Sequence, residues 1–304
     1  MRVGQATQPV INLLRDVLLD SFIVHGDETE VQVLKEPGRE AQARSYMWVQ
    51  MTQASGADGT GPPIRLFGYS PSRSTHSAKT LYEGLRPGGA LMSDGYEPYA
   101  AIAAQHRLVH LGCWAHCRRY FHEALQAIPK DKRGPEQLPA RFIALIGLLY
   151  KVEADARRDH MDAPALQQLR KLHSKPVLEQ IEALALQHLH GVLPGSLLGK
   201  ALHYVTAQWP KLVRYVDDGR YPIDNNACEN AIRPFVVGRR NWLFADTVGG
   251  AHASANLYSL LQTCLVNGID GYRYLRALLV ELPKAKTVED FEALLPWQLA
   301  PANR

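Results

Sequence analysis

Three acidic residues stand where a fold could hold their carboxylates in place. Asp27 follows the apolar run 22–24, Asp94 follows 90–92 and precedes a glycine, and Glu229 lies within DNNACEN. If the two aspartates end neighbouring strands, their side chains can converge, and a later helix can add Glu229. Three carboxylates repel one another unless cations neutralise them, and oxygen ligands suit Mg²⁺ or Mn²⁺. The pattern favours a two-metal site for phosphoryl transfer.

Each acid also has a structural interpretation. An aspartate at a strand end often forms a turn. Asp224 or Asn225 can cap a helix that begins there, and the helix dipole favours an acid such as Glu229 in its early turns. The catalytic hypothesis therefore depends on the elements that carry the acids.

The apolar pattern predicts these elements. The stretch 10–22 has one apolar stripe and indicates an amphipathic helix. Runs rich in β-branched and aromatic residues predict three sequential antiparallel strands at 22–34, 44–52 and 63–72. A helix, a strand, a helix and a buried strand are predicted to follow at 76–85, 88–96, 97–105 and 106–113. The predicted order is βββαβαβ.

The pattern of the rest of the chain predicts mainly helices. From Trp114 to Val216 the pattern predicts helices, followed by a short helix around Glu229 that ends at Pro234 and a strand over 235–245. We therefore predict an α/β fold with a mixed sheet, a mainly helical insertion and a helical C-terminal segment. The predicted divisions are an N-terminal helix (1–18), a first core part (19–113), the insertion (114–222), a second core part (223–250) and the C-terminal segment (251–304).

Composition limits the class of protein. A chain of 304 residues with 46% hydrophobic residues can form one large domain or two smaller ones. Its small basic excess, 34 against 30 charges, suits a nucleic-acid partner or an ordinary enzyme. Four irregularly spaced cysteines favour a reducing compartment. With no signal peptide and no apolar run of roughly 20 residues, we expect a soluble cytoplasmic protein without membrane contact.

Several long stretches resemble the transposases of the IS66 insertion-sequence family. They include HGDETEVQVLKEPGREAQARSYMWV, LMSDGYEPY, GCWAHCRRYFHEAL and IDNNACENAIRPFVVGRRNWLFADTVGG. The resemblance implies a DDE enzyme with an RNase H-like core and catalytic, metal-binding Asp27, Asp94 and Glu229. It also implies two Mg²⁺ or Mn²⁺ ions, DNA partners (transposon ends and target) and a homo-oligomer on DNA.

The implied reaction is cleavage of a DNA 3′ end followed by strand transfer. Two alternatives keep the fold: a nuclease without strand transfer, and an inactive remnant that only binds DNA. Two departures from the family bear on this choice. The family usually has alanine where this chain has Gly26, which we expect to loosen the strand beside Asp27. The family also places DNA-binding and zinc-binding parts before the opening helix, so we expect end recognition to lie outside this chain.

The CWAHC motif places Cys113 and His116 at a Cys-x-x-His spacing. A zinc finger would need a second ligand pair at finger spacing, which does not follow. Several DDE families have a similar signature, which implies that His116 neighbours the active site; a core histidine is the alternative. Arg118 and Arg119 follow, and either face phosphate or form a solvated helix face.

A basic and aromatic cluster follows Glu229. Arg233, Arg239 and Arg240 are candidates for phosphate contacts, and Trp242 for stacking on an unpaired base. The alternative for Trp242 is a place in the core. The amides that precede Glu229, Asn225 and Asn226, are further candidates for DNA binding or active-site support.

Overall fold

The computed structural model describes residues 2–299 and divides into two compact units. The sheet unit comprises Met1–Leu91, Tyr96–Val109 and Asn226–Arg304. The helical unit comprises Met92–Gly95 and His110–Asn225. The chain therefore leaves the sheet unit after Leu91 and again after Val109.

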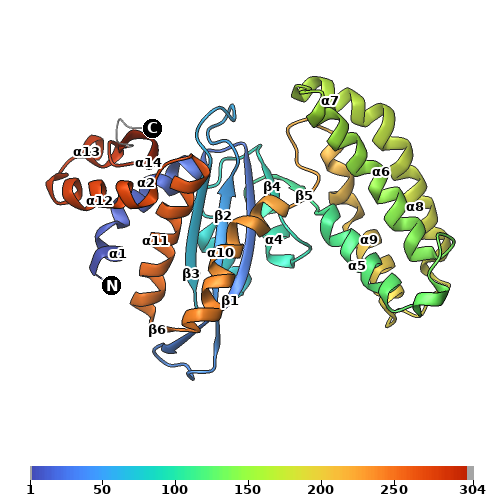
Figure 1. Ribbon diagram of the computed structural model, residues 1–304, viewed down its shortest axis with the longest axis horizontal. Helices are drawn as coiled ribbons and strands as arrows, with labels where there is room; N and C mark the ends of the chain where they lie inside the picture. Colours follow the sequence, from blue (N-terminus) through green and yellow to red (C-terminus); the bar gives the residue numbers. More distant parts are fainter. Residues whose placement is uncertain (1, 300–304) are drawn as a thin grey trace. The chain divides into compact units, whose positions relative to one another are not determined.

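A mixed sheet forms the centre of the fold, with the strand order β3-β2-β1-β4-β5 and with β6 paired to β1 (Figure 1). Its strands are β1 (Ile23–Lys35), β2 (Arg44–Thr52), β3 (Ile64–Ser70), β4 (Ala90–Met92), β5 (Val109–Leu111) and β6 (Ala245–Thr247). β2 runs antiparallel to both β1 and β3, whereas β6 runs parallel to β1. The predicted antiparallel pairing of the first three strands is confirmed, and the first and fourth strands are neighbours.

Helices cover both faces of the three long strands. Side chains alternate between the faces of a strand, so Met47 and Val49 point one way and Trp48 the other. The face of Met47 and Val49 is covered by α10 (Asn226–Trp242) and α11 (Val248–Val266), which Figure 1 shows beside the sheet. The opposite face is covered by α2 (Gln8–Leu19), α3 (Thr75–Leu81) and α4 (Glu97–Gln105).

The remaining helices of the sheet unit lie near its two ends in sequence. They are α1 (Arg2–Ala6), α12 (Gly271–Glu281), a 3₁₀ turn (Leu282–Lys284), α13 (Val288–Glu292) and α14 (Pro296–Leu299). α11 begins at Val248, where the Thr247 hydroxyl accepts a hydrogen bond from the backbone N–H of Gly250 and caps the helix.

The prediction for the segment after Glu229 was wrong. Instead of a helix ending at Pro234 and a strand over 235–245, one helix runs through Pro234 to Trp242. A proline inside a helix removes one backbone hydrogen bond. Here Ile232 and Phe235, on either side of the proline, are both buried against the sheet. Their burial keeps the helix continuous.

The helical unit contains the helices predicted between Trp114 and Val216. They are α5 (Trp114–Gln126), a 3₁₀ turn (Lys130–Lys132), α6 (Leu138–Arg158), α7 (Ala163–Leu169), a π-helical turn (Arg170–Ser174), α8 (Lys175–Leu189), α9 (Leu197–Leu212) and a 3₁₀ turn (Val213–Val216). Phe121 of α5 stacks on Phe142 of α6 in its core. Within residues 2–299, no helix combines the length and apolar character that a membrane crossing requires.

A buried ion pair joins the π-helical turn to α6. The Arg170 side chain is 2% exposed, and its Nε and Nη2 donate to the two carboxylate oxygens of Glu153 at 2.8 and 2.7 Å. Its Nη1 donates to the backbone carbonyls of Tyr215 and Asp218. One guanidinium thereby ties together three segments of the helical unit.

Candidate active site

Asp27 lies within β1 and is partly exposed. Its Oδ1 accepts a hydrogen bond from the backbone N–H of Glu28 at 2.9 Å. The alternation along β1 places Asp27 on the same face as Val31, which packs with α10. The neighbouring Glu28 points to the opposite face of β1.

Glu229 lies in the first turn of α10 and is also partly exposed. The preceding residue, Cys228, is buried between α10 and the sheet. Burial raises the pKa of the Cys228 thiol well above its usual value, and the charges of Asp27, Glu28 and Glu229 raise it further, while Arg65 opposes them. Cys228 is thus a shared neighbour of Asp27 and Glu229.

Gly26 is closely packed by side chains of the sheet unit, which bears on the expectation that it loosens the strand. A Cβ atom built on Gly26 would lie 2.1 Å from Tyr82 Oη and 2.7 Å from Tyr99 Cε1. Two buried tyrosines therefore fill the space that an alanine methyl would occupy. Glycine is the residue that this packing requires beside Asp27.

Asp94 belongs to the helical unit and follows the buried Ser93. The Ser93 hydroxyl lies 2.9 Å from His110 Nε2, and the Ser93 N–H donates to the carbonyl of Leu111. Partial burial lowers the pKa of Lys211, and the charge of Asp94 raises it back in part. Asp94 therefore has a lysine from the end of α9 within electrostatic range.

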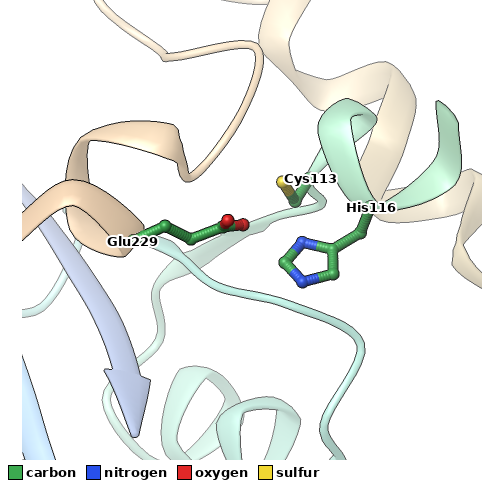
Figure 2. A group of neighbouring side chains, drawn as sticks. All are labelled: Cys113, His116 and Glu229. Atoms are coloured by element: carbon green, nitrogen blue, oxygen red, sulfur yellow. The ribbon is translucent and has the colours of Figure 1, made fainter. Parts of the chain in front are cut away.

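Cys113 and His116 lie at the start of α5. The Cys113 Sγ accepts a hydrogen bond from the backbone N–H of Asn225 at 3.2 Å, and it lies within 4.8 Å of a ring nitrogen of His116. Figure 2 shows these two side chains at the start of α5, and Glu229 on the first turn of α10. All three residue types can bind metals, and thiolate and imidazole suit zinc better than magnesium.

The other candidate residues differ in exposure. Arg118, Arg119, Asn226, Arg233 and Arg240 are exposed, whereas Asn225 is buried. Arg239 is half-buried and its Nη1 donates to the Thr29 hydroxyl of β1 at 3.1 Å.

Trp242 ends α10, half-buried, with its ring edge-on to Phe235 at a centroid distance of 5.2 Å. The segment was predicted to be a strand, yet the packing of Trp242 follows helical spacing from Phe235. Lys211 and Cys228 were not singled out by the sequence. Their proximity to the acids depends on tertiary packing that no local motif reports.

A pH prediction follows from His110. Burial lowers its pKa from 6.5 to about 3, with a smaller contribution from Lys211. His110 binds a proton near pH 6.5 in the unfolded chain, but only near pH 3 in the folded chain. The titration of His110 therefore leaves the free energy of unfolding unchanged above pH 6.5 and lowers it as the pH drops towards 3. For this partly exposed ring we expect a loss of about 2 kcal/mol between pH 7 and 4.5.

Chemical unfolding at a series of pH values measures this loss. The His110→Gln variant should lose about 2 kcal/mol less than the wild type over the same range. The exposed His160 supplies the control variant, His160→Gln, which should follow the wild type. Parallel acid profiles for wild type and His110→Gln would contradict the prediction.

Models of known protein families match nearly the whole chain. The family model described as "Transposase IS66 family" matches residues 1–253, and that described as "IS66 C-terminal element" matches residues 259–297. Together the two models cover nearly the whole chain. No solved structure matches it.

Curated relatives come from Sinorhizobium fredii (strain NBRC 101917 / NGR234). "Uncharacterized protein y4qI" is 30% identical over 96% of this chain and 54% of its own length. "Uncharacterized protein y4jD" is 29% identical over 97% of this chain and 57% of its own length. The chain therefore spans about half the length of the curated relatives it matches.

Proposed function

Because this chain belongs to the IS66 transposase family, we propose that it carries the catalytic acids of a DNA transposase: Asp27, Asp94 and Glu229. The observation that carries the proposal is that the helix bearing Glu229 packs on the sheet face to which Asp27 points. The proposed reaction is metal-dependent cleavage of a DNA 3′ end, followed by attack of that 3′-OH on target DNA.

The strand order supports convergence of the two aspartates. β1 and β4 are neighbours, and the N–H of Ala90 donates to the carbonyl of Phe22 at 2.7 Å. The three antiparallel strands followed by β4 and β5 also support an RNase H-like core as part of the proposal.

The donor set fits divalent metal ions, as membership of this family implies. Three partly exposed carboxylates supply hard oxygen ligands, which suit Mg²⁺ or Mn²⁺. When bound, a pair of such ions activates the attacking oxygen and stabilises the leaving oxygen. The Cys113 thiol suits these ions poorly, so we assign Cys113 and His116 to supporting the start of α5 and the segment before Glu229.

The exposed face of α10 is the proposed path of DNA away from Glu229. Residues three or four positions apart share one face of a helix. Along α10 this spacing joins the exposed residues Asn226, Asn230, Arg233, Val237 and Arg240. The set contains two cations and no acid, so it suits a phosphate backbone. Trp242 packs against Phe235, which makes stacking on a base a lesser role for it.

The double substitution Arg233→Gln and Arg240→Gln should weaken DNA binding at every sequence. Each phosphate contact contributes about 0.9 to the slope of log affinity against log salt, so we expect the slope to fall by about 2. Fluorescence anisotropy with a duplex at several salt concentrations measures it. Lys284→Gln, which removes a cation paired with Glu281 in the C-terminal segment, is the matched control. An unchanged slope in the double variant would exclude this face from the DNA path.

The proposed function is tested with the full chain, Mg²⁺ or Mn²⁺, and DNA carrying the ends of its own insertion sequence. Metal-dependent 3′ cleavage, and joining of a precleaved end to a plasmid target, are the expected results. Cleavage without joining would identify a nuclease. Binding without either reaction would identify an inactive DNA-binding protein.

A further inference from the structure

Glu28, next to Asp27, is a buried carboxylate held by an arginine and a tyrosine. Its side chain is 2% exposed and lies on the face of β1 opposite Asp27. Arg73 donates to Glu28 Oε1 through Nε at 2.6 Å and through Nη2 at 2.5 Å. The Tyr99 hydroxyl donates to Glu28 Oε2 at 2.6 Å.

These partners extend to the segment that follows Asp94. The Arg73 guanidinium lies 3.8 Å from the ring centroid of Tyr96, and the Tyr96 hydroxyl donates to the Arg73 carbonyl. Tyr96 is the N-cap residue of α4, Tyr99 lies in its first turn, and Asp94 precedes Tyr96 by two residues. We name the four residues Glu28, Arg73, Tyr96 and Tyr99 the Glu28 clamp.

The hydrogen bonds of the Glu28 clamp resist displacement because they satisfy a buried charge. A buried carboxylate that loses its partners incurs a desolvation penalty of several kcal/mol, so Arg73 and Tyr99 are held against Glu28. The Arg73 guanidinium packs on the Tyr96 ring, and the Tyr99 hydroxyl is hydrogen-bonded to Glu28. The beginning of α4 therefore cannot shift along β1 without breaking charged hydrogen bonds. Gly26 adds to this fit, since it accepts the ring of Tyr99 beside the strand.

We infer that the Glu28 clamp is a positioning device for the metal-binding acids: it fixes the chain just after Asp94 to the strand residue next to Asp27. The inference rests on the proposed catalytic role of Asp27 and Asp94. The clamp residues touch neither DNA nor metal in this scheme. They act through the backbone, by fixing the positions of Asp27 and Asp94 before metal binds.

The test compares two ion pairs of the same strand. Glu28→Gln keeps the shape of the side chain and removes the charge that holds Arg73. Glu30→Gln is the matched control, because Glu30 also pairs with an arginine, Arg44, but both side chains of that pair are exposed. Tyr99→Phe is the second clamp variant; it retains the ring that packs edge-on against Trp48 and removes the hydroxyl that donates to Glu28.

Two readouts on the full chain separate positioning from stability. The first is Mn²⁺ affinity, measured from free Mn²⁺ by electron paramagnetic resonance; we expect at least a tenfold loss in Glu28→Gln, a smaller loss in Tyr99→Phe and none in Glu30→Gln. The second is amide hydrogen exchange in residues 93–97, which we expect to accelerate at least tenfold in the clamp variants. A purely structural role would lower the melting temperature and leave the Mn²⁺ affinity of the folded protein unchanged.

The outcomes distinguish this inference from the proposed function. Folded clamp variants with wild-type Mn²⁺ affinity and wild-type exchange in 93–97 would overturn the clamp, even if the protein cuts DNA. Mn²⁺ binding that is insensitive to Asp27→Asn would overturn the proposed metal site. In that case the exchange of 93–97 still decides whether Glu28 fixes this segment, and unchanged exchange would overturn the clamp independently.

Discussion

Replacing Asp27 by Asn should lower metal-dependent DNA cleavage by about 10³-fold while the protein stays folded. A neutral amide binds a divalent ion far more weakly than a carboxylate, and a loss of about 4 kcal/mol of transition-state stabilisation corresponds to that factor. Asp94→Asn and Glu229→Gln should have similar effects if the three acids share the ions. Single-turnover cleavage of end DNA at saturating protein measures the change.

Stability provides the control for this experiment. Removing one of several neighbouring negative charges relieves repulsion, so the metal-free variants should melt at or above the wild-type temperature. Mg²⁺ or Mn²⁺ should raise the melting temperature of the wild type more than that of the variants. Asp246→Asn removes an exposed carboxylate that pairs with Lys35 of β1, and it should leave cleavage unchanged. Strong destabilisation of metal-free Asp27→Asn would indicate a structural role for Asp27.

Arg170→Met should destabilise the helical unit by about 3–5 kcal/mol, the cost of leaving the carboxylate of a buried ion pair without its partner. Glu153 would then remain with an 11% exposed side chain and no guanidinium, and two backbone carbonyls would lose a donor. Denaturant unfolding of the full chain, followed by circular dichroism, measures the loss. Because Asp94 belongs to this unit, cleavage should fall at temperatures where the unit begins to melt.

Two further variants identify the cause. Arg170→Met combined with Glu153→Met should recover most of the stability, since an apolar pair of similar volume replaces a buried charge pair at little net cost. Arg158→Met removes an exposed arginine that pairs with Asp155 and Asp159, and should change stability by less than about 1 kcal/mol. Equal losses in Arg170→Met and Arg158→Met would show that burial of the pair is unimportant.

Local patterning predicted the strands and helices where one property dominated. β2 and α4 have the predicted limits, because β2 is rich in aromatic and β-branched residues and α4 is rich in alanine between a proline and a histidine. β4 and β5 are shorter than predicted, with three residues each. In such short strands, the pairing with neighbours decides the ends, and the sequence of the strand itself contains little of that information.

The continuity of α10 could not be predicted from local rules. Pro234 ordinarily marks the end of a helix, and the residues after it are β-branched or aromatic. What holds them in a helix is the sheet surface beneath Phe235, formed by residues such as Val49 and Phe67 that are far away in sequence. The identity of Glu229 as a candidate was accessible from sequence, whereas the helix that positions it was only half recognised.

The candidate site, too, could be predicted from the sequence only in part. Asp27 and Glu28 are adjacent acids on opposite faces of β1, and Glu28 is paired with Arg73. Sequence similarity implied a role for Asp27. It offered no reason to connect Glu28 with Arg73 or Tyr99, because these pairs form only when α3 and α4 pack on the sheet.

The covering of one sheet face by α10 and α11 has a consequence for synthesis of the protein. A ribosome completes β3 at Ser70 but does not reach Asn226 for about 10–30 s at roughly 5–20 residues per second. During that interval the apolar side chains of β1 to β3 on this face have none of their final cover. The nascent chain is thus a natural client for chaperones that shield hydrophobic surface.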